Sequence, residues 1–219
     1  MIDFDKLKEP FPADDIEWRS QRTGGEEGNF WAMVLAYVTN RAIMERLDDV
    51  CGPENWYNEF RPAPNGGVMC GISIRIDNDD LLPNWVTKWD GADNTKEEAV
   101  KGGLSGAMKR AGVQWGIGRY LYKLQATFVK HEEKGTHRND VKHWETKKKI
   151  GVIKWNDPTL PDWALPKLIT EEQMSTWTDI ASSADISVKD LSLKFGLTKR
   201  TTEKDADEMI KQALAHYQK

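Results

Sequence analysis

This chain of 219 residues has only two cysteines and no long apolar segment. Cys51 and Cys70 lie in unlike settings and no spacing pairs them, which indicates a reducing, intracellular location. The first ten residues, MIDFDKLKEP, contain no apolar run, so they cannot form a signal peptide. No stretch approaches the ~18 apolar residues that a membrane span requires. We therefore expect a cytoplasmic protein with no membrane partner.

The chain also lacks an excess of positive charge and a phosphate-binding loop. Its formal net charge is −4, which argues against DNA binding by bulk charge alone. The pattern G-x-x-x-x-G-K followed by Ser or Thr is absent, which argues against an ATP-driven recombinase or helicase. We therefore expect no cofactor. Hydrophobic residues make up 39% and charged residues 30% of the chain, which is typical of a globular domain.

The charges that are present are unevenly distributed. Residues 1–84 carry 8 basic and 16 acidic side chains, whereas residues 85–154 carry 15 basic and 8 acidic ones. Residues 155–219 carry 8 basic and 11 acidic side chains. A polyanion responds to the local field, so the basic middle block is a candidate nucleic-acid surface. The ten Trp residues of the chain either fill the core or stack on bases.

The first fifty residues predict an extended arm and a helix. Residues 4–20 contain Pro10 and Pro12 and are interpreted as an arm that lies on the domain. The glycines of residues 23–28 then break the chain. Apolar residues between 29 and 50 share one arc at 100° per residue, which predicts an amphipathic helix with Arg41 on its opposite side.

Three antiparallel strands and a second helix follow. The strands are expected at 56–61, 68–76 and 85–89, and alternating apolar side chains make the second the clearest. The helix is expected at 96–111, preceded by a capping-box pattern of Thr95 with Glu98. The predicted fold class is α+β: a helix, a three-stranded antiparallel sheet that can leave one face free for a ligand, and a second helix.

The remaining residues predict further strands and a small helical module. Residues 121–155 are interpreted as strands around a charged hairpin tip at 132–140. Three prolines within 156–166 indicate a linker. Three short helices are expected after it, at 171–182, 187–196 and 202–217. The predicted organisation is thus a main domain, a Pro-rich linker and a helical module, at 1–156, 157–167 and 168–219.

Residues 97–122, EEAVKGGLSGAMKRAGVQWGIGRYLY, combine the chemistry of a nucleic-acid surface. Cations neutralise phosphates, rings stack on bases of any sequence, and glycines let two backbones approach closely. The rings of Trp115 and Tyr122 either fill the core or stack on bases. Lys109 lies on a polar stripe of the predicted helix, apart from its buried face, so Lys109 and Arg110 face either solvent or a ligand.

This segment resembles the signature helix of the Rad52/Rad22 single-strand annealing family, above all its phage branch and the DNA-damage-response proteins of radiation-resistant bacteria. Four further segments agree in order: IEWR at 16–19, YVTNR at 37–41, GPENWYNEF at 52–60 and WVTKWDGADNT at 85–95. The resemblance implies a curved antiparallel sheet that cradles the signature helix. It also implies a ring or filament of subunits, with a basic groove that holds DNA by its backbone.

The resemblance assigns individual residues to that groove. It places Arg41 at an inner-groove arginine and Lys109 at a phosphate-contacting arginine of the signature helix. Ser105 and Gly106 stand where the family has two further cations, and we expect Arg110 or Lys101 to substitute for them. Lys96 and Lys88 are candidates for an outer groove. The predicted DNA-binding residues are Arg41, Lys88, Lys96, Lys101, Lys109, Arg110, Trp115, Arg119 and Tyr120.

The implied function is ATP-independent annealing of complementary single strands in recombination or repair, by a phage or bacterial protein. Backbone contacts supply affinity and Watson–Crick pairing supplies specificity, so no covalent chemistry is needed. We therefore expect no enzyme activity. The expected partners are single-stranded DNA and further copies of the chain. The helical module is a candidate contact for a single-strand-binding protein, from its position alone.

A metal-dependent nuclease is the alternative function. Glu145 and Lys147, with Asp140 or Asp93 upstream, have the residue types of a nuclease core, which also needs an acidic residue on an adjoining strand. Three histidines are spaced six apart between 131 and 143, but a charged hairpin accounts for them better than a metal. A third hypothesis is a duplex binder that uses the C-terminal helices as a helix-turn-helix.

Overall fold

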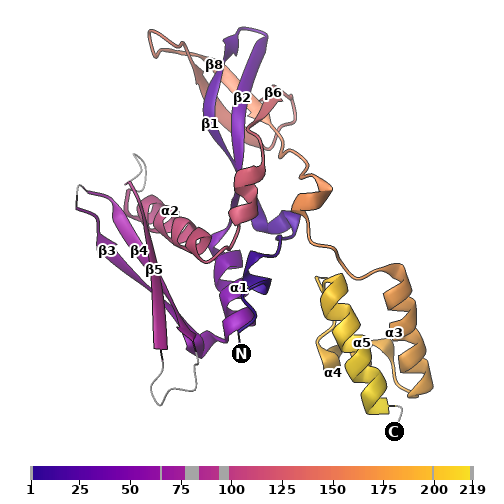
Figure 1. The fold of residues 1–219 in the computed structure, drawn as a ribbon. Helices are drawn as coiled ribbons and strands as arrows, with labels where there is room; N and C mark the ends of the chain where they lie inside the picture. The colour runs from indigo at the N-terminus through magenta and orange to yellow at the C-terminus, as the bar shows by residue number, and fades with distance from the viewer. Residues whose placement is uncertain (1, 65, 77–83, 94–98, 199, 218–219) are drawn as a thin grey trace. The chain divides into compact units, whose positions relative to one another are not determined.

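The computed structural model describes residues 2–64, 66–76, 84–93, 99–198 and 200–217. The chain divides into two compact units, Met1–Ala164 and Leu165–Lys219, which are described separately (Figure 1). Across the described ranges, no helix is both long enough and apolar enough to cross a membrane.

The first unit has the α+β character that the sequence predicts. Its strands form three antiparallel sheets, in the orders β1–β2–β6, β3–β4–β5 and β7–β8. Its elements along the chain are η1 (Lys6–Lys8), η2 (Ala13–Asp15), β1 (Ile16–Glu26), β2 (Asn29–Val38), α1 (Asn40–Cys51), η3 (Pro53–Asn55), β3 (Trp56–Pro62), β4 (Val68–Ile76), β5 (Asn84–Ala92), α2 (Ala99–Gln114), η4 (Arg119–Lys123), β6 (Thr127–Lys130), β7 (His137–Lys142), β8 (Lys149–Trp155) and η5 (Asp162–Ala164).

The predicted three-stranded sheet and the helix that follows it are confirmed. β4 is the central strand, and it pairs with β3 and β5 in continuous antiparallel register. Its alternation buries Cys70, Ile72 and Ile74 completely. α2 packs against this sheet (Figure 1) and buries Ala107 and Ala111. The predicted capping box before α2 lies outside the described residues.

The predicted helix over residues 29–50 is wrong in its first half. Residues 29–38 form β2, which pairs with β1 in a long hairpin around the glycine-rich segment. Ala32, Val34 and Val38 are buried, but every residue from 30 to 38 is apolar or aromatic, a continuous run whose periodicity does not distinguish a helix from a strand. Long-range pairing therefore decided the outcome. α1 begins after Thr39, whose Oγ1 accepts a hydrogen bond of 3.2 Å from the Ala42 N–H.

The N-terminal arm lies on the domain as predicted but is shorter and less extended. Two short 3-10 helices occupy part of it, and residues 16–20 belong to β1. Leu7 and Phe11 are buried. Arg46 of α1 fixes the arm, because its guanidinium donates to three main-chain carbonyls of the arm at 2.7–3.2 Å and lies 4.1 Å from the centroid of the Phe11 ring.

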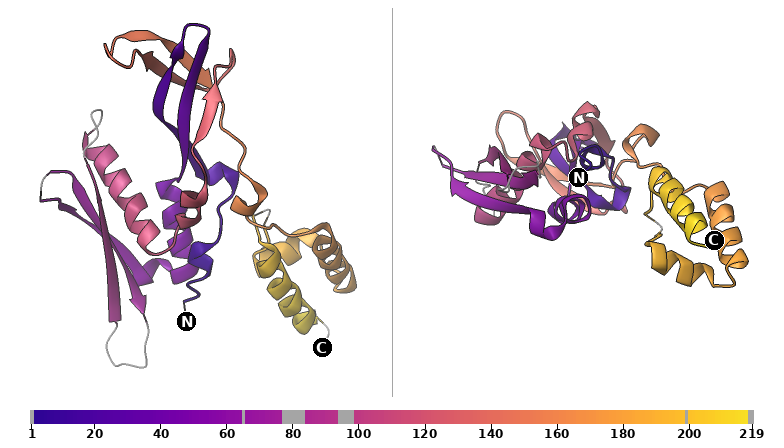
Figure 2. Two further views of the ribbon diagram at one scale, coloured as in Figure 1. Left: turned by 45° about the horizontal axis from the view of Figure 1, so that its top comes forward. Right: turned by 60° about the horizontal axis from the view of Figure 1, so that its bottom comes forward.

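The hairpin in the second half of this unit turns at residues 143–148, so the predicted tip at 132–140 is wrong. β7 pairs with β8 from His137 opposite Trp155 onward. The hairpin lies beside β1 and β2 (Figures 1 and 2), where the Thr23 hydroxyl donates to the Asp140 carbonyl at 2.9 Å. Both segments are rich in charge, and composition alone does not tell which one closes the ladder.

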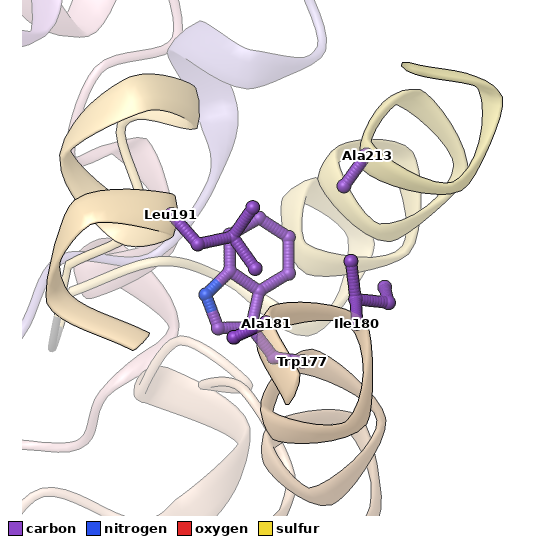
Figure 3. Packing of buried hydrophobic residues seen from close by; sticks show 5 residues of the cluster. All are labelled: Trp177, Ile180, Ala181, Leu191 and Ala213. Atoms are coloured by element: carbon purple, nitrogen blue, oxygen red, sulfur yellow. The ribbon is translucent and has the colours of Figure 1, made fainter. Parts of the chain in front are cut away.

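The second unit consists of α3 (Glu171–Ser183), α4 (Val188–Phe195) and α5 (Glu203–Tyr217), within one residue of the predicted ranges. Thr170 and Gln173 form a complete capping box at the start of α3. The core is built around the Trp177 ring (Figure 3), which is fully buried and donates its Nε1–H to the Ser192 hydroxyl at 3.0 Å. The ring is surrounded by Ile180, Ala181, Leu191 and Ala213.

Candidate nucleic-acid interface

A cleft of about 650 Å³ lies within the first unit, between the β1–β2 hairpin, α2 and η4. The start of β1 and the end of β2 form one wall, and one face of α2 forms another. Ser105 and Gly106 line the α2 face. A Cβ at position 106 would lie 3.1 Å from the Ala92 Cβ, so glycine lets α2 approach β5 closely. This contact gives a packing reason for the missing cation at that position.

Lys109 lies in this cleft, but it is less exposed than its place on the polar stripe predicts. Its side chain is only 14% exposed. The ammonium forms an ion pair with the Glu17 carboxylate of β1, and it lies 5.8 Å from the centroid of the Tyr37 ring. Burial lowers the pKa of Lys109 to about 8. The Lys109 ammonium therefore carries its charge near neutral pH, loses it at mildly alkaline pH, and pairs with the carboxylate of Glu17.

Arg110 and Arg19 add two more exposed cations to the same cleft. Arg110 pairs with Asp90 of β5 at 3.0 Å, and Arg19 pairs with Glu17 at 3.2 Å. Burial alone would raise the pKa of Asp90, but hydrogen bonds from Gln114, the Gly91 N–H and Arg110 lower it. Two carboxylates thus hold three cations around one cleft.

The side chains of Lys88, from β5, and Arg119, from η4, lie at the C-terminal end of α2. Arg119 donates to the carbonyls of Val113 and Gln114 at 2.7–2.9 Å, and Lys88 donates to the Gln114 carbonyl at 3.1 Å. Both cations therefore satisfy the carbonyls that end a helix. Burial, and then repulsion by Arg119 and Lys8, lower the pKa of Lys88. Neither residue is among those that line the cleft.

The structure places two rings that were predicted to bind DNA in contacts within the domain. Trp115 belongs to the core: it is 6% exposed and donates its Nε1–H to the Ile72 carbonyl at 2.9 Å. Tyr120 is partly buried, and its hydroxyl accepts a hydrogen bond of 2.9 Å from the Phe11 N–H of the N-terminal arm. Burial is the main cause that raises the pKa of Tyr120. The Trp115 ring therefore offers no free face to a base.

Three predicted residues remain, and the structure describes the side chain of Arg41 among them. Arg41 is exposed in the first turn of α1 and is not among the lining residues. Lys96 lies outside the described residues, as does the side chain of Lys101. The sequence missed Tyr37 and Arg19, because the strands that carry them were interpreted as a helix and an arm. Tyr122, which lines the cleft, is 70% exposed.

Side chains predicted for the alternative nuclease site make other contacts in the structure. Asp140 pairs with Lys149 at 2.7 Å, and the Lys147 ammonium donates to the Trp144 carbonyl. Asp93 lines the cleft. Among the described residues, no three His, Cys, Asp or Glu side chains are grouped closely enough to hold a metal ion.

Comparisons with known proteins point in one direction. The model of the Rad52/22 family of double-strand break repair proteins matches residues 4–140. The single-stranded DNA-binding protein DdrA of Deinococcus radiodurans is 33% identical over 163 residues, which are 74% of this chain and 66% of that protein. Its counterpart in Deinococcus deserti is 29% identical over 163 residues, which are 74% of this chain and 69% of that protein. No solved structure gives a significant match.

Proposed function

Since this chain belongs to the Rad52/22 family of double-strand break repair proteins, we propose that it binds single-stranded DNA and anneals complementary strands without ATP. The observation that carries the proposal is the cleft in which Lys109, Arg110 and Arg19 come together, within the matched residues. Its similarity to the two DdrA proteins, which are single-stranded DNA-binding proteins, supports the same ligand.

Cations of the cleft contact phosphates, and the bases are left free to pair. Lys109 and Arg110 face the carboxylates of Glu17 and Asp90, so a phosphate would compete with these carboxylates for the two cations. The exposed Tyr122 ring adds a surface on which a base can stack. Affinity then comes from the backbone and specificity from base pairing. No step breaks a covalent bond, so the proposed activity is not enzymatic.

The protein acts as a ring or filament of many copies in this proposal. One cleft holds three cations, which contact few phosphates and give weak binding at physiological salt. Repetition of the cleft along a strand multiplies those contacts through linked binding. The excess of acidic residues in 1–84 and of basic residues in 85–154 suits head-to-tail contacts between copies.

The second unit is proposed to contact a single-strand-binding protein. Two observations support this proposal. The unit follows the matched residues, and α4 exposes the apolar side chains of Val188 and Leu193. Leu193 is 73% exposed, which suits a protein contact better than a phosphate contact.

Removal of the second unit should leave DNA binding intact. A chain that ends at Lys167 keeps the whole first unit, Met1–Ala164, and the three cations of its cleft. We expect a cooperative melting transition and an affinity for single-stranded DNA within about twofold of the full chain, measured by circular dichroism and fluorescence anisotropy. Loss of either property would place the second unit within the DNA-binding structure.

Binding should weaken with rising pH because of Lys109. Burial lowers the pKa of Lys109 to about 8, so the ammonium is mostly charged near neutral pH and mostly neutral one unit above that pKa. Only the charged form attracts phosphate, so affinity should fall by about tenfold from about pH 7 to about pH 9. Lys109→Arg keeps the charge at both pH values and should remove the fall. A pH dependence that persists in Lys109→Arg would assign it to another group.

Competition between single-stranded and duplex DNA tests the proposed function. A labelled single strand bound to the full chain should be displaced by unlabelled single strand far more effectively than by duplex of equal length. Equal displacement would favour the duplex-binding hypothesis. The same labelled strand should stay intact during incubation with Mg²⁺, whereas cleavage would favour the nuclease.

A further inference from the structure

The turn between β7 and β8 carries an aromatic ring that is almost fully in solvent. Trp144 is 73% exposed, although Trp is among the largest apolar side chains and is usually well buried. The turn, residues 143–148, follows the last residue that the family model matches, residue 140. The matched part of the family therefore does not account for it.

The same turn is strongly basic. Lys142, Lys147, Lys148 and Lys149 are all exposed and surround Trp144 in the sequence, against the single carboxylate of Glu145. Lys149 is paired with Asp140. In the part of the chain that the structure describes, no carboxylate forms an ion pair with Lys142, Lys147 or Lys148. The hydrogen bond from Lys149 and, to a lesser extent, the charge of Lys142 lower the pKa of Asp140, and the Lys147 ammonium donates to the Trp144 carbonyl. These charges are therefore engaged only in part and can still attract an anion.

Hydrogen bonds order the backbone of this turn, and the Trp144 ring lies near the His143 ring, with 6.4 Å between their centroids. The His143 N–H donates to the Lys148 carbonyl at 2.8 Å, and the Lys147 N–H donates to the His143 carbonyl at 2.9 Å. The His143 ring also accepts from the Thr146 N–H at 3.3 Å. Lys147 adopts a left-handed φ of 57°, where glycine or asparagine would be favoured.

The turn lies away from the cleft, toward the other end of the β1–β2 hairpin. A Cβ at Gly151 of β8 would lie 2.3 Å from the Phe30 ring, so β8 passes close to the outer end of β2. Tyr37, at the inner end of β2, lines the cleft. Seven residues separate Phe30 from Tyr37, which corresponds to roughly 23 Å along a strand. The turn and the cleft are therefore separate surfaces.

We propose that this turn is a second contact for single-stranded DNA, in which Trp144 stacks on a base and Lys142, Lys147 and Lys148 approach the neighbouring phosphates. An exposed ring beside these lysines suits a single strand, because its bases can stack on the ring while its phosphates attract the cations. A duplex hides its base faces and offers nothing to the ring. The inference rests on the proposed function for its ligand, but not on the cleft for its site.

Trp144→Ala in the full chain tests the stacking contact. We expect binding to oligothymidylate about fivefold weaker or worse, measured by fluorescence anisotropy. Trp163→Ala is the matched control, because Trp163 is also exposed, at 52%, but lies outside the basic turn. The same measurement on an abasic oligonucleotide separates stacking from charge. Wild type should lose affinity for the abasic strand, whereas Trp144→Ala should lose less, because only the stacking on Tyr122 remains to be removed.

Lys142→Gln with Lys148→Gln tests the phosphate contacts independently of the ring. The double variant should lower the salt slope of binding by about 1.4, with or without bases in the strand. Unchanged binding in both Trp144→Ala and the lysine variant would overturn the proposal, even if variants of the cleft abolish binding. Equal losses of Trp144→Ala on normal and abasic strands would also overturn it. Failure of the wild-type chain to bind any single strand would instead overturn the proposed function as well.

Discussion

A chain with both Lys109→Gln and Arg110→Gln should bind single-stranded DNA about two orders of magnitude more weakly than the wild type. A hydrogen bond to a charged group contributes about 1.5–3 kcal/mol, and each variant removes one phosphate contact. The slope of log affinity against log salt should fall by about 1.4, since single strands lose about 0.7 per contact. Salt titrations by fluorescence anisotropy measure both effects.

Thermal melting by circular dichroism should accompany these titrations, because Lys109 is only 14% exposed and its loss leaves the Glu17 carboxylate with Arg19 as its ion-pair partner. Arg110 is 53% exposed, so loss of its ion pair with Asp90 has little effect on the free energy of unfolding. Lys211→Gln is the matched control, because Lys211 is an exposed lysine of α5 in the second unit. If the double variant binds as tightly as Lys211→Gln, the cleft does not hold the DNA backbone.

Trp177→Ala should unfold the second unit while the first unit stays folded. The Trp177 ring is fully buried at the centre of three helices (Figure 3). Its removal costs about 3–5 kcal/mol, and a unit of this size has roughly 3–8 kcal/mol of stability in total. Hydrogen exchange should therefore become fast across Leu165–Lys219 only.

The control for this variant lies on the exposed face of the same helix. Ser175→Ala changes an exposed side chain of α3 and should leave exchange in both units as in the wild type. If Trp177→Ala also exposes the amides of β3, β4 and β5, the two units do not fold independently. Slow exchange throughout the second unit would show that its core tolerates the loss of the ring.

Local patterns were sufficient to predict the elements that rest on local physics. β4 alternates strictly between apolar and other residues, and Thr170 with Gln173 marks the start of α3. Residues 29–38 could not be assigned in this way, because residues 30–38 are all apolar or aromatic and such a run suits both a helix and a strand. Their state depends on pairing with β1, which a local pattern does not contain.

The candidate site divides along a similar line. Resemblance led to Lys109 and Arg110, and both line the cleft. Lys88 and Arg119 were predicted for their charge, but hydrogen bonds to the end of α2 use their donors. Charge in a sequence does not distinguish a cation that meets DNA from one that meets a helix carbonyl. That difference appears only when α2 and its neighbours are packed together.

Annealing of complementary oligonucleotides without ATP tests the central claim most directly. A donor and an acceptor dye on the two strands report pairing as energy transfer, with spontaneous pairing as the baseline. The proposed function predicts that the wild-type chain raises the rate well above this baseline and that Lys109→Gln with Arg110→Gln returns it to the baseline. A wild-type rate equal to the spontaneous one, under conditions where the strands are bound, would contradict the claim.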